Sequence, residues 1–435
     1  MRRLLSLLLV AGGLGRGASM RAQEPPSPGA PIRLTVADAE ALALKNNPQI
    51  TVTRLNALAS QQISQEVRSA RYPTLTAYLT GVVAEQGSRI TAGAINNPIL
   101  YDRLAGGAAV GQLITDFGRT GNLVESSNLR AQAEEQKAVA TAAQITLAVD
   151  QAFYQALETR ALQDVAQQTL EARQAVADQV RALTESKLKS DLDLSFAEVN
   201  LAEAKLLRID AENNEKSALA VLSAVLGYSR DQAFELIDET PSLEAPSREL
   251  DRLTALAISR RPELAALQLE SRALERFHIA EEDLSRPSVR TLGVIGGAPV
   301  RNEHLSSWYG AIGFNVEIPV FNGYLFTARA KEADLRAQAA REQLRDLENT
   351  VTRDVRTSWL AANTAYDRLA VTRQLLDQAN QALDLARTRY TLGLGSIVEL
   401  TQAQLQATRA QIGDTDSRYQ YRLSQAVLRF EIGGP

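Results

Sequence analysis

The sequence contains no cysteine, and its 435 residues include only two histidines, His278 and His304. Without cysteine there is no disulfide, no thiolate metal site, no cysteine nucleophile and no cysteine that could carry a lipid anchor. Neither histidine has a companion ligand at a spacing that suits a metal, and no Gly-Lys-Ser/Thr phosphate loop is present. These absences argue against a catalytic site, a cofactor or a bound metal, and we expect the protein not to be an enzyme.

Helix-breaking residues are missing from two long stretches. No proline occurs between Pro98 and Pro241, and no glycine interrupts 122–226; the stretch 324–392 contains neither residue. Proline and glycine most strongly disfavour a helix interior, so both stretches are predicted to be helical. Aromatic residues make up only 5% of the chain, which is typical of long helices that pack closely. A helix from about 120 to 185 would be about 100 Å long at ~1.5 Å per residue.

Long apolar runs are also missing, except at the N-terminus. Two arginines precede the apolar run 4–10, and small residues lead from it to Ala22, as in an export signal. We expect residues 1–22 to be that signal and 23–33 to be a linker. No other segment approaches the ~20 consecutive apolar residues of a membrane-spanning helix. The net charge is -4 without a basic block, so nucleic acid is not expected as a partner.

The strongest pattern is an internal duplication. Pro48 and Pro262 begin similar helical patterns 214 residues apart, whereas the serines Ser190 and Ser396, in two later turns, are 206 apart. The shortening falls where loops between strands are expected, since loop tips tolerate changes of length. We divide the chain into a first repeat, a connector and a second repeat, each repeat running helix, two strands, long helical hairpin. Their ranges are 34–228, 229–252 and 253–435.

The predicted strands are short, and two of them alternate clearly. In 74–83 and 311–318, apolar residues fall on one face and mostly polar or small residues on the other. Further strands are predicted at 103–115 and 288–296. One polar face is what a transmembrane barrel requires; the edge of a soluble sheet is the alternative. Four strands cannot close a barrel, and lipid does not tolerate an open edge, so several chains would have to complete it.

Several motifs occur in a recognisable order and resemble a known family. The resemblance is to the outer-membrane efflux proteins, the TolC-like outer-membrane factors, and it covers about 34–433. The motifs that carry it are Asn46-Asn47-Pro48, Arg71-Tyr72-Pro73, Asp116-Phe117-Gly118-Arg119, and the segments 318–323 and 389–400.

This resemblance implies a fold that is mainly α with a membrane β-barrel. Three identical chains would each give four strands to a twelve-stranded barrel and long helices to a periplasmic tunnel, with the connector around its middle. It implies a passive channel in the cell outer membrane, in contact with its lipid. The partners implied are a periplasmic adaptor and an inner-membrane pump, in a tripartite efflux or type I secretion system. Drugs, metals and secreted proteins all remain open as cargo. The alternatives are a periplasmic adaptor and a structural coiled-coil protein of the envelope.

The two hairpin turns are the candidate functional sites, because the resemblance places them at the periplasmic tip where an adaptor docks. Lys187 stands where relatives often carry glycine, so the two turns are expected to differ. The docking candidates are Lys187, Leu188, Ser190, Gly393, Leu394, Gly395 and Ser396.

Two acidic residues, Asp193 and Glu399, correspond across the duplication and are candidates for the entrance gate. Repeated three times in a trimer, these carboxylates could form a ring that favours cations. The alternative is that each only caps its helix, since acids are favoured in a first helical turn and Ser396 with Glu399 has capping-box spacing.

Overall fold

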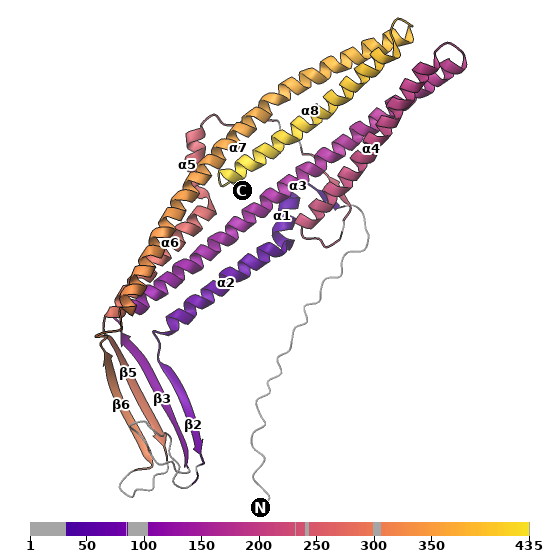
Figure 1. Cartoon of the computed structure of the whole chain (residues 1–435). Coiled ribbons are helices and arrows are strands. Elements are labelled where there is room, and N and C mark those ends of the chain that lie inside the picture. Colours follow the sequence, from indigo (N-terminus) through magenta and orange to yellow (C-terminus); the bar gives the residue numbers. More distant parts are fainter. Residues whose placement is uncertain are drawn as a thin grey trace, which may run out of the picture.

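The computed structural model describes residues 32–83, 85, 103–230, 232–239, 243–298 and 306–434. The expected signal 1–22, most of the expected linker and His304 lie outside the described residues. The described part is elongated: a β-sheet occupies one end and the turns of two helical hairpins occupy the other (Figure 1).

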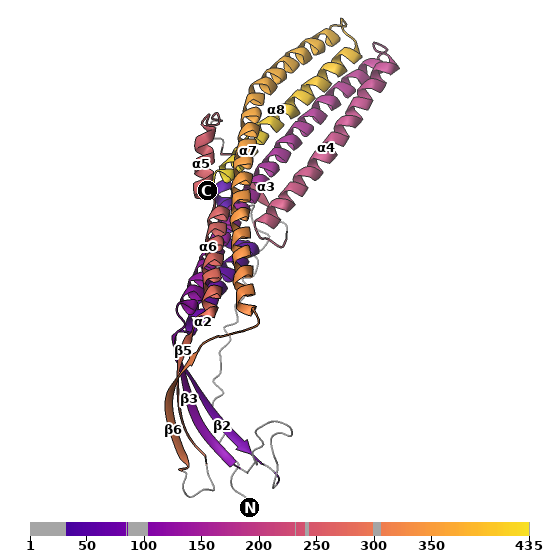
Figure 2. The same cartoon turned by 60° about the vertical axis from the view of Figure 1, so that its left-hand side comes forward.

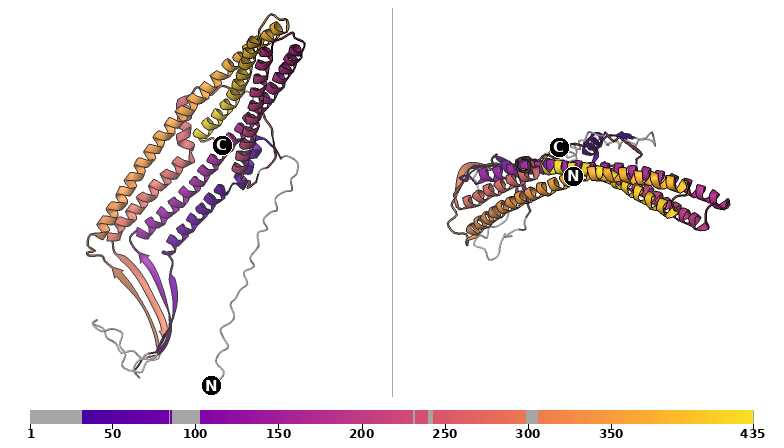
Figure 3. Two further views of the ribbon diagram at one scale, coloured as in Figure 1. Left: turned by 45° about the vertical axis from the view of Figure 1, so that its right-hand side comes forward. Right: turned by 90° about the horizontal axis from the view of Figure 1, so that it is seen from above.

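Four long helices make up most of the structure. They are α3 (Arg119–Glu185), α4 (Asp191–Val225), α7 (Leu325–Thr391) and α8 (Ile397–Glu431). Both α3 and α7 have 67 residues, about 100 Å at ~1.5 Å per residue, so the predicted long helices are confirmed. Seen from above, they lie in one thin curved layer (Figure 3). Among the described residues, no helix is both long and apolar enough to cross a membrane.

Shorter helices pack beside the long ones in two pairs, and α6 lies between α3 and α7 (Figure 1). The first pair is α1 (Val36–Asn46) and α2 (Pro48–Ser69), and the second is α5 (Leu250–Arg260) and α6 (Pro262–Glu282), which runs into the short 3-10 turn η1 (Asp283–Ser285). Proline stands at the first helical position of α2 and α6, where its missing N–H costs no helical hydrogen bond.

Four antiparallel strands form the sheet at one end. They are β2 (Thr74–Val82), β3 (Arg103–Thr115), β5 (Ser288–Gly297) and β6 (Trp308–Glu317), in the order β2-β3-β5-β6. All four predicted strands are present, within a few residues of the expected bounds. In the structure β2 and β6 are edge strands, each with one hydrogen-bonding side unpaired. Figure 2 shows that the sheet curves away from the helices.

The pairing register sorts the side chains of this sheet onto two contrasting faces. One face carries large apolar side chains that are exposed, among them Leu79 (79%), Ile312 (86%) and Phe314 (77%). The opposite face carries mainly polar and small residues, for example Thr74 beside Gly111 and Arg290 beside Asn315, with Leu292 as a large apolar exception. A chain on its own therefore leaves a large apolar surface uncovered.

A second, small sheet lies beside the middle of the long helices. In it β1 (Ile32–Leu34) pairs in parallel with β4 (Phe234–Leu236) from the connector. The end of the expected linker is therefore a strand rather than free chain, and the first helix begins at Val36 instead of Leu34. Parallel pairing joins residues about 200 positions apart, which local sequence patterns do not reveal.

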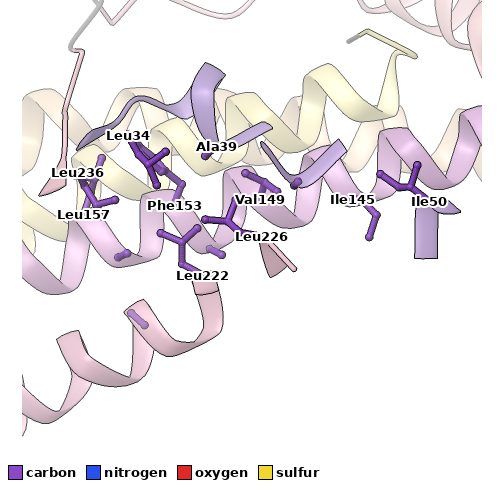
Figure 4. Close-up of a cluster of buried hydrophobic side chains, with 14 residues drawn as sticks. Leu34, Ala39, Ile50, Ile145, Val149, Phe153, Leu157, Leu222, Leu226 and Leu236 are labelled. Atoms are coloured by element: carbon purple, nitrogen blue, oxygen red, sulfur yellow. The ribbon is translucent and has the colours of Figure 1, made fainter. Parts of the chain in front are cut away.

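The largest buried apolar cluster holds this region together. Phe153 and Val149 of α3 share this cluster with Ala39 of α1, Leu222 of α4 and Leu236 of β4, and all five are buried (Figure 4). The second half has a similar cluster, in which Leu253, Ala257 and Leu264 pack on Val351 and Val355 of α7. Both clusters lie along the long helices, so they fix the short helices to the middle of the layer.

Glycine is required where each hairpin returns to a short helix. Gly227 (φ 86°) follows α4, and a Cβ there would lie 2.9 Å from the carbonyl oxygen of Asn46 at the end of α1. Gly433 (φ 71°) follows α8, and its Cβ would lie 2.9 Å from the Cβ of Arg260 at the end of α5. Positive φ and close approach both exclude larger residues, so each long hairpin ends against its own short helix.

Candidate functional site

The turn between α3 and α4 begins with a left-handed residue. Lys187 has φ 58°, and the N–H of Leu188 donates to the Leu183 carbonyl at 2.8 Å, five residues back. This hydrogen bond is that of a Schellman helix end, which satisfies carbonyls left over at the C-terminus of the helix. Leu188 is 71% exposed at the tip of the hairpin.

The turn between α7 and α8 has the same backbone structure. Gly393 has φ 73°, and the N–H of Leu394 donates to the Arg389 carbonyl at 2.8 Å, again five residues back. Leu394 is 68% exposed. Lys187 therefore takes the conformation that Gly393 takes, and the difference expected between the turns is one of side chain, not of backbone. A residue with a Cβ is less stable than glycine in this conformation by ~1 kcal/mol.

Asp193 and Glu399 occupy equivalent positions in the first turns of α4 and α8, but their carboxylates have different partners. The carboxylate of Asp193 accepts hydrogen bonds from the Ser190 hydroxyl at 2.8 Å and the Ser190 N–H at 3.1 Å, completing a capping box. The N–H of Glu399 likewise donates to the Ser396 hydroxyl at 3.1 Å. The Glu399 carboxylate instead pairs with Arg389, with Nε and Oε1 2.9 Å apart.

Gly395 makes room for this ion pair. A Cβ at Gly395 would lie 3.1 Å from Oε2 of Glu399 and 3.2 Å from Cβ of Arg389. The guanidinium of Arg389 also donates to the Leu394 carbonyl at 3.2 Å. The second turn is thus closed by a charged side-chain contact that the first turn lacks. The equivalent residue on α3 is Leu183, which has no charge to offer.

A contact between the two hairpins joins the tips. The Lys189 ammonium lies 4.3 Å from the centre of the Tyr390 ring, a cation–π arrangement. Tyr390 is buried, and its hydroxyl has no hydrogen-bond partner among the described residues. Burial, and secondarily the nearby carboxylate of Asp193, raise the pKa of Tyr390. Lys189 and Tyr390 are 201 positions apart in the sequence, so no local spacing identifies this contact.

Beneath the tips, apolar residues from both hairpins form one core. Tyr390, Ile397 and Leu400 from the second hairpin pack with Val180 and Leu201 from the first. Further along, the Arg173 guanidinium of α3 donates to the Gln404 side chain of α8, and both residues are buried. The hairpins therefore meet as one packed body over their outer part, and a movement of one tip within the chain involves the other.

A second group of charges lies at the middle of the long helices. Asp150 of α3 is 3% exposed, and its Oδ2 lies 3.5 Å from Nη2 of Arg429 on α8. Burial, then a hydrogen bond with Glu40 of α1 and the charge of Glu40, raise the pKa of Asp150 to about 7. Nearby, burial and then the charge of Asp416 raise the pKa of Glu158 to about 7. No sequence pattern marks either carboxylate, because the groups that act on Asp150 and Glu158 come from other helices.

Within the part of the chain that the structure describes, no group of three His, Asp or Glu side chains is arranged to hold a metal ion. Most of the charged groups described above have a structural partner: Asp193 caps its helix, Glu399 and Asp150 are in ion pairs, and Lys189 lies over a ring.

Comparison with known proteins gives a consistent result over most of the chain. A protein-family model described as "Outer membrane efflux protein" matches residues 41–228 and 253–434. The outer membrane protein OprJ of Pseudomonas aeruginosa is 26% identical over 409 residues, which cover 90% of this chain and 82% of OprJ.

Solved structures share the fold. A membrane protein from Pseudomonas aeruginosa superposes with a TM-score of 0.81 at 20% identity, covering 95% of this chain and 96% of that one. The outer membrane protein VceC of Vibrio cholerae superposes with a TM-score of 0.80 at 19% identity, covering 92% of this chain and 96% of VceC. These likenesses extend over both the sheet and the helical hairpins.

Proposed function

This chain belongs to the outer membrane efflux protein family, and on that premise we propose that three copies form one passive conduit from the periplasm to the exterior. As a family member it is an outer-membrane efflux protein. The conduit would serve a tripartite efflux or type I secretion system, with a periplasmic adaptor and an inner-membrane pump as its partners. The pump would supply the energy, and the conduit itself would be passive.

The main observation that supports the proposed trimer is the open sheet with its exposed apolar face. In lipid, the unpaired edges of β2 and β6 would each leave backbone groups without hydrogen bonds, at a cost of several kcal/mol per group. Pairing β6 of one copy with β2 of the next removes these edges. Two copies would give eight strands, whose interior is just filled by side chains, whereas three give twelve and leave a lumen.

The apolar face of the sheet supports the same arrangement. Leu79, Ile312 and Phe314 would face lipid, and the row of Arg290 and Asn315 would face water in the lumen. Trp308 and Tyr72, near opposite ends of the sheet, are both exposed, and such aromatics are favoured at membrane interfaces.

The duplication is supported by the bounds of the helices. From α3 to α7 and from α4 to α8, both ends shift by 206 residues (119 to 325, 185 to 391, 191 to 397 and 225 to 431). From α2 to α6 the start shifts by 214 (48 to 262). Each half would thus give the trimer two strands and one helical hairpin, and the tunnel would have approximate sixfold symmetry. The repeats are 34–228 and 253–435.

The hairpin tips are proposed to bind the adaptor. Leu188 and Leu394 are exposed at equivalent places, and matching backbone turns would present both to the same type of surface. The remaining docking residues are Lys187, Ser190, Gly393, Gly395 and Ser396. Asp193 and Glu399 are proposed to line the entrance, although the capping box and the Arg389 ion pair already give each carboxylate a structural role.

Membrane fractionation with crosslinking tests the proposed assembly. We expect the protein in the outer-membrane fraction as a trimer, and discrete conductance steps when the purified trimer enters a planar bilayer. A pair of cysteines placed on β2 and β6 should crosslink between chains, because these strands pair in the proposed barrel. The natural chain has no cysteine that could form a competing crosslink. Recovery as a soluble monomer after osmotic shock would contradict the proposal.

A further inference from the structure

One row across the sheet places two tyrosines and two glycines side by side. The register pairs Tyr78 of β2 with Gly107 of β3, Gly107 with Gly296 of β5, and Gly296 with Tyr309 of β6. The row lies on the polar face, since the neighbouring positions along β6 belong to the exposed apolar face. It is one residue from the end of β5 and from the start of β6, so it lies near the end of the sheet away from the helices.

The Tyr309 ring does not stand away from the sheet but lies over the two glycines. A Cβ on Gly296 would be 2.5 Å from the Tyr309 hydroxyl oxygen and 2.6 Å from the ring carbon that bears it. A Cβ on Gly107, one strand further, would be 3.0 Å from the same oxygen. The phenol thus crosses β5 and reaches β3, and an aromatic ring that covers glycines in this way stabilises a sheet.

We propose that Gly107 and Gly296 leave the space in which the Tyr309 ring lies flat against the barrel wall. This flat orientation would set the free width of the lumen near its outer end. The inference rests on the proposed trimeric barrel. In that barrel three copies of Tyr309 lie at one level, so the orientation of this side chain is repeated three times around the lumen.

The expected size of the effect follows from barrel geometry. Twelve strands about 4.8 Å apart and tilted by about 40° enclose a backbone ring about 24 Å wide. Ordinary side chains reduce the opening to roughly 14 Å. Three phenols that stand off the wall would reduce the open area roughly by half, whereas three flat phenols add little. The glycines therefore matter for large cargo and for large probes, and little for small ions.

The experiment measures how fast a bulky, membrane-impermeant maleimide, added outside intact cells, labels a cysteine below the row. Asn315→Cys supplies that cysteine, on the same face and closer to the helices, in a chain without natural cysteine. Adding Gly296→Ala should lower the labelling rate at least threefold, because the new methyl displaces the ring. Adding Tyr309→Ala to Gly296→Ala should restore the rate. Gly313→Ala is the matched control: it lies on the same face and a Cβ there meets nothing within 4 Å, so the rate should stay within twofold.

Two results overturn the proposal: an unchanged rate in trimeric Gly296→Ala, or a lowered rate that Tyr309→Ala fails to restore. Because a Cβ on Gly296 also approaches the Gly106 carbonyl oxygen at 2.8 Å, that variant could fail to assemble. In that case Tyr309→Ala with both glycines intact tests the proposal. If the Tyr309 ring lies flat, its removal should raise the labelling rate of Asn315→Cys less than twofold, whereas removal of a projecting ring should raise that rate more. The proposed barrel itself fails separately, if Ile312→Cys on the opposite face is labelled as fast as Asn315→Cys.

Discussion

Replacing the buried Asp150 by asparagine should change how the stability of the protein depends on pH. Asp150 of α3 interacts with Glu40 of α1 and Arg429 of α8, and its Oδ1 has no hydrogen-bond partner among the described residues. Tyr154 of α3 interacts with Asp150 as well, and Arg422 of α8 lies near Tyr154. Burial and Glu40 raise the pKa of Asp150 to about 7, against the lowering effect of Arg429.

The direction of the effect follows from proton binding. An unfolded chain releases the Asp150 proton near pH 3.8, whereas the folded chain keeps it to about pH 7. The folded state therefore binds more protons between these values, and the free energy of unfolding falls as the pH rises through this window. The penalty is absent below pH 3.8 and complete above pH 7. About three pKa units correspond to a ceiling of about 4 kcal/mol, which is shared with Glu40 because the two carboxyls interact.

Thermal unfolding of the detergent-solubilised protein, followed by circular dichroism at a fixed scan rate, measures this effect. The apparent Tm of the parent should fall by several degrees between pH 5 and pH 8. Asp150→Asn cannot ionise, so its Tm should fall much less, and at pH 8 it should exceed that of the parent. Glu212→Gln is the control: this carboxylate is partly exposed and hydrogen-bonded to Lys216, which lowers its pKa, so removing it should bring no gain at pH 8. Parallel pH curves for the parent and Asp150→Asn would refute the reasoning.

Three further predictions concern the tips and the core. Lys187→Gly should stabilise the protein by ~1 kcal/mol, because the left-handed conformation no longer opposes a Cβ; thermal unfolding would show no gain if the turn were not left-handed. In single-channel recordings, Asp193→Asn combined with Glu399→Gln should reduce cation preference, and parental conductance and selectivity would leave both residues as helix caps only. Leu222→Ala should cost about 2–5 kcal/mol, since Leu222 is fully buried; a change below 1 kcal/mol by denaturant titration would contradict the described packing.

The long helices and the strands were predictable because their signals are local. Proline at the first turn of α2, a 67-residue run without proline for α3, and period-two alternation in β2 each depend on residues close in the sequence. The offset of 206 residues then related the second hairpin to the first.

The features that the sequence did not reveal depend on residues far apart. Asp150 meets Arg429 across 279 positions, and β1 meets β4 across about 200, so no spacing rule identifies either pair. At the tips, capping-box spacing correctly indicated that Ser396 would begin a helix, but the Glu399 side chain turned to Arg389 instead. Both partners are charged and lie on opposite sides of a turn, and only the three-dimensional path of that turn brings them together.

The parallel pairing of β1 with β4 has a consequence for the order in which an exported chain can fold. A chain that emerges N-terminus first presents Ile32–Leu34 long before Phe234–Leu236, so the first strand must wait for some 200 more residues to cross the membrane. The second half waits almost as long, because Ile432 and Gly433 pack on α5 only some 170 residues after Arg260 has emerged. Until these late partners arrive, part of the apolar surface around β1 and α5 stays uncovered, so the nascent protein depends on its surroundings during much of its passage.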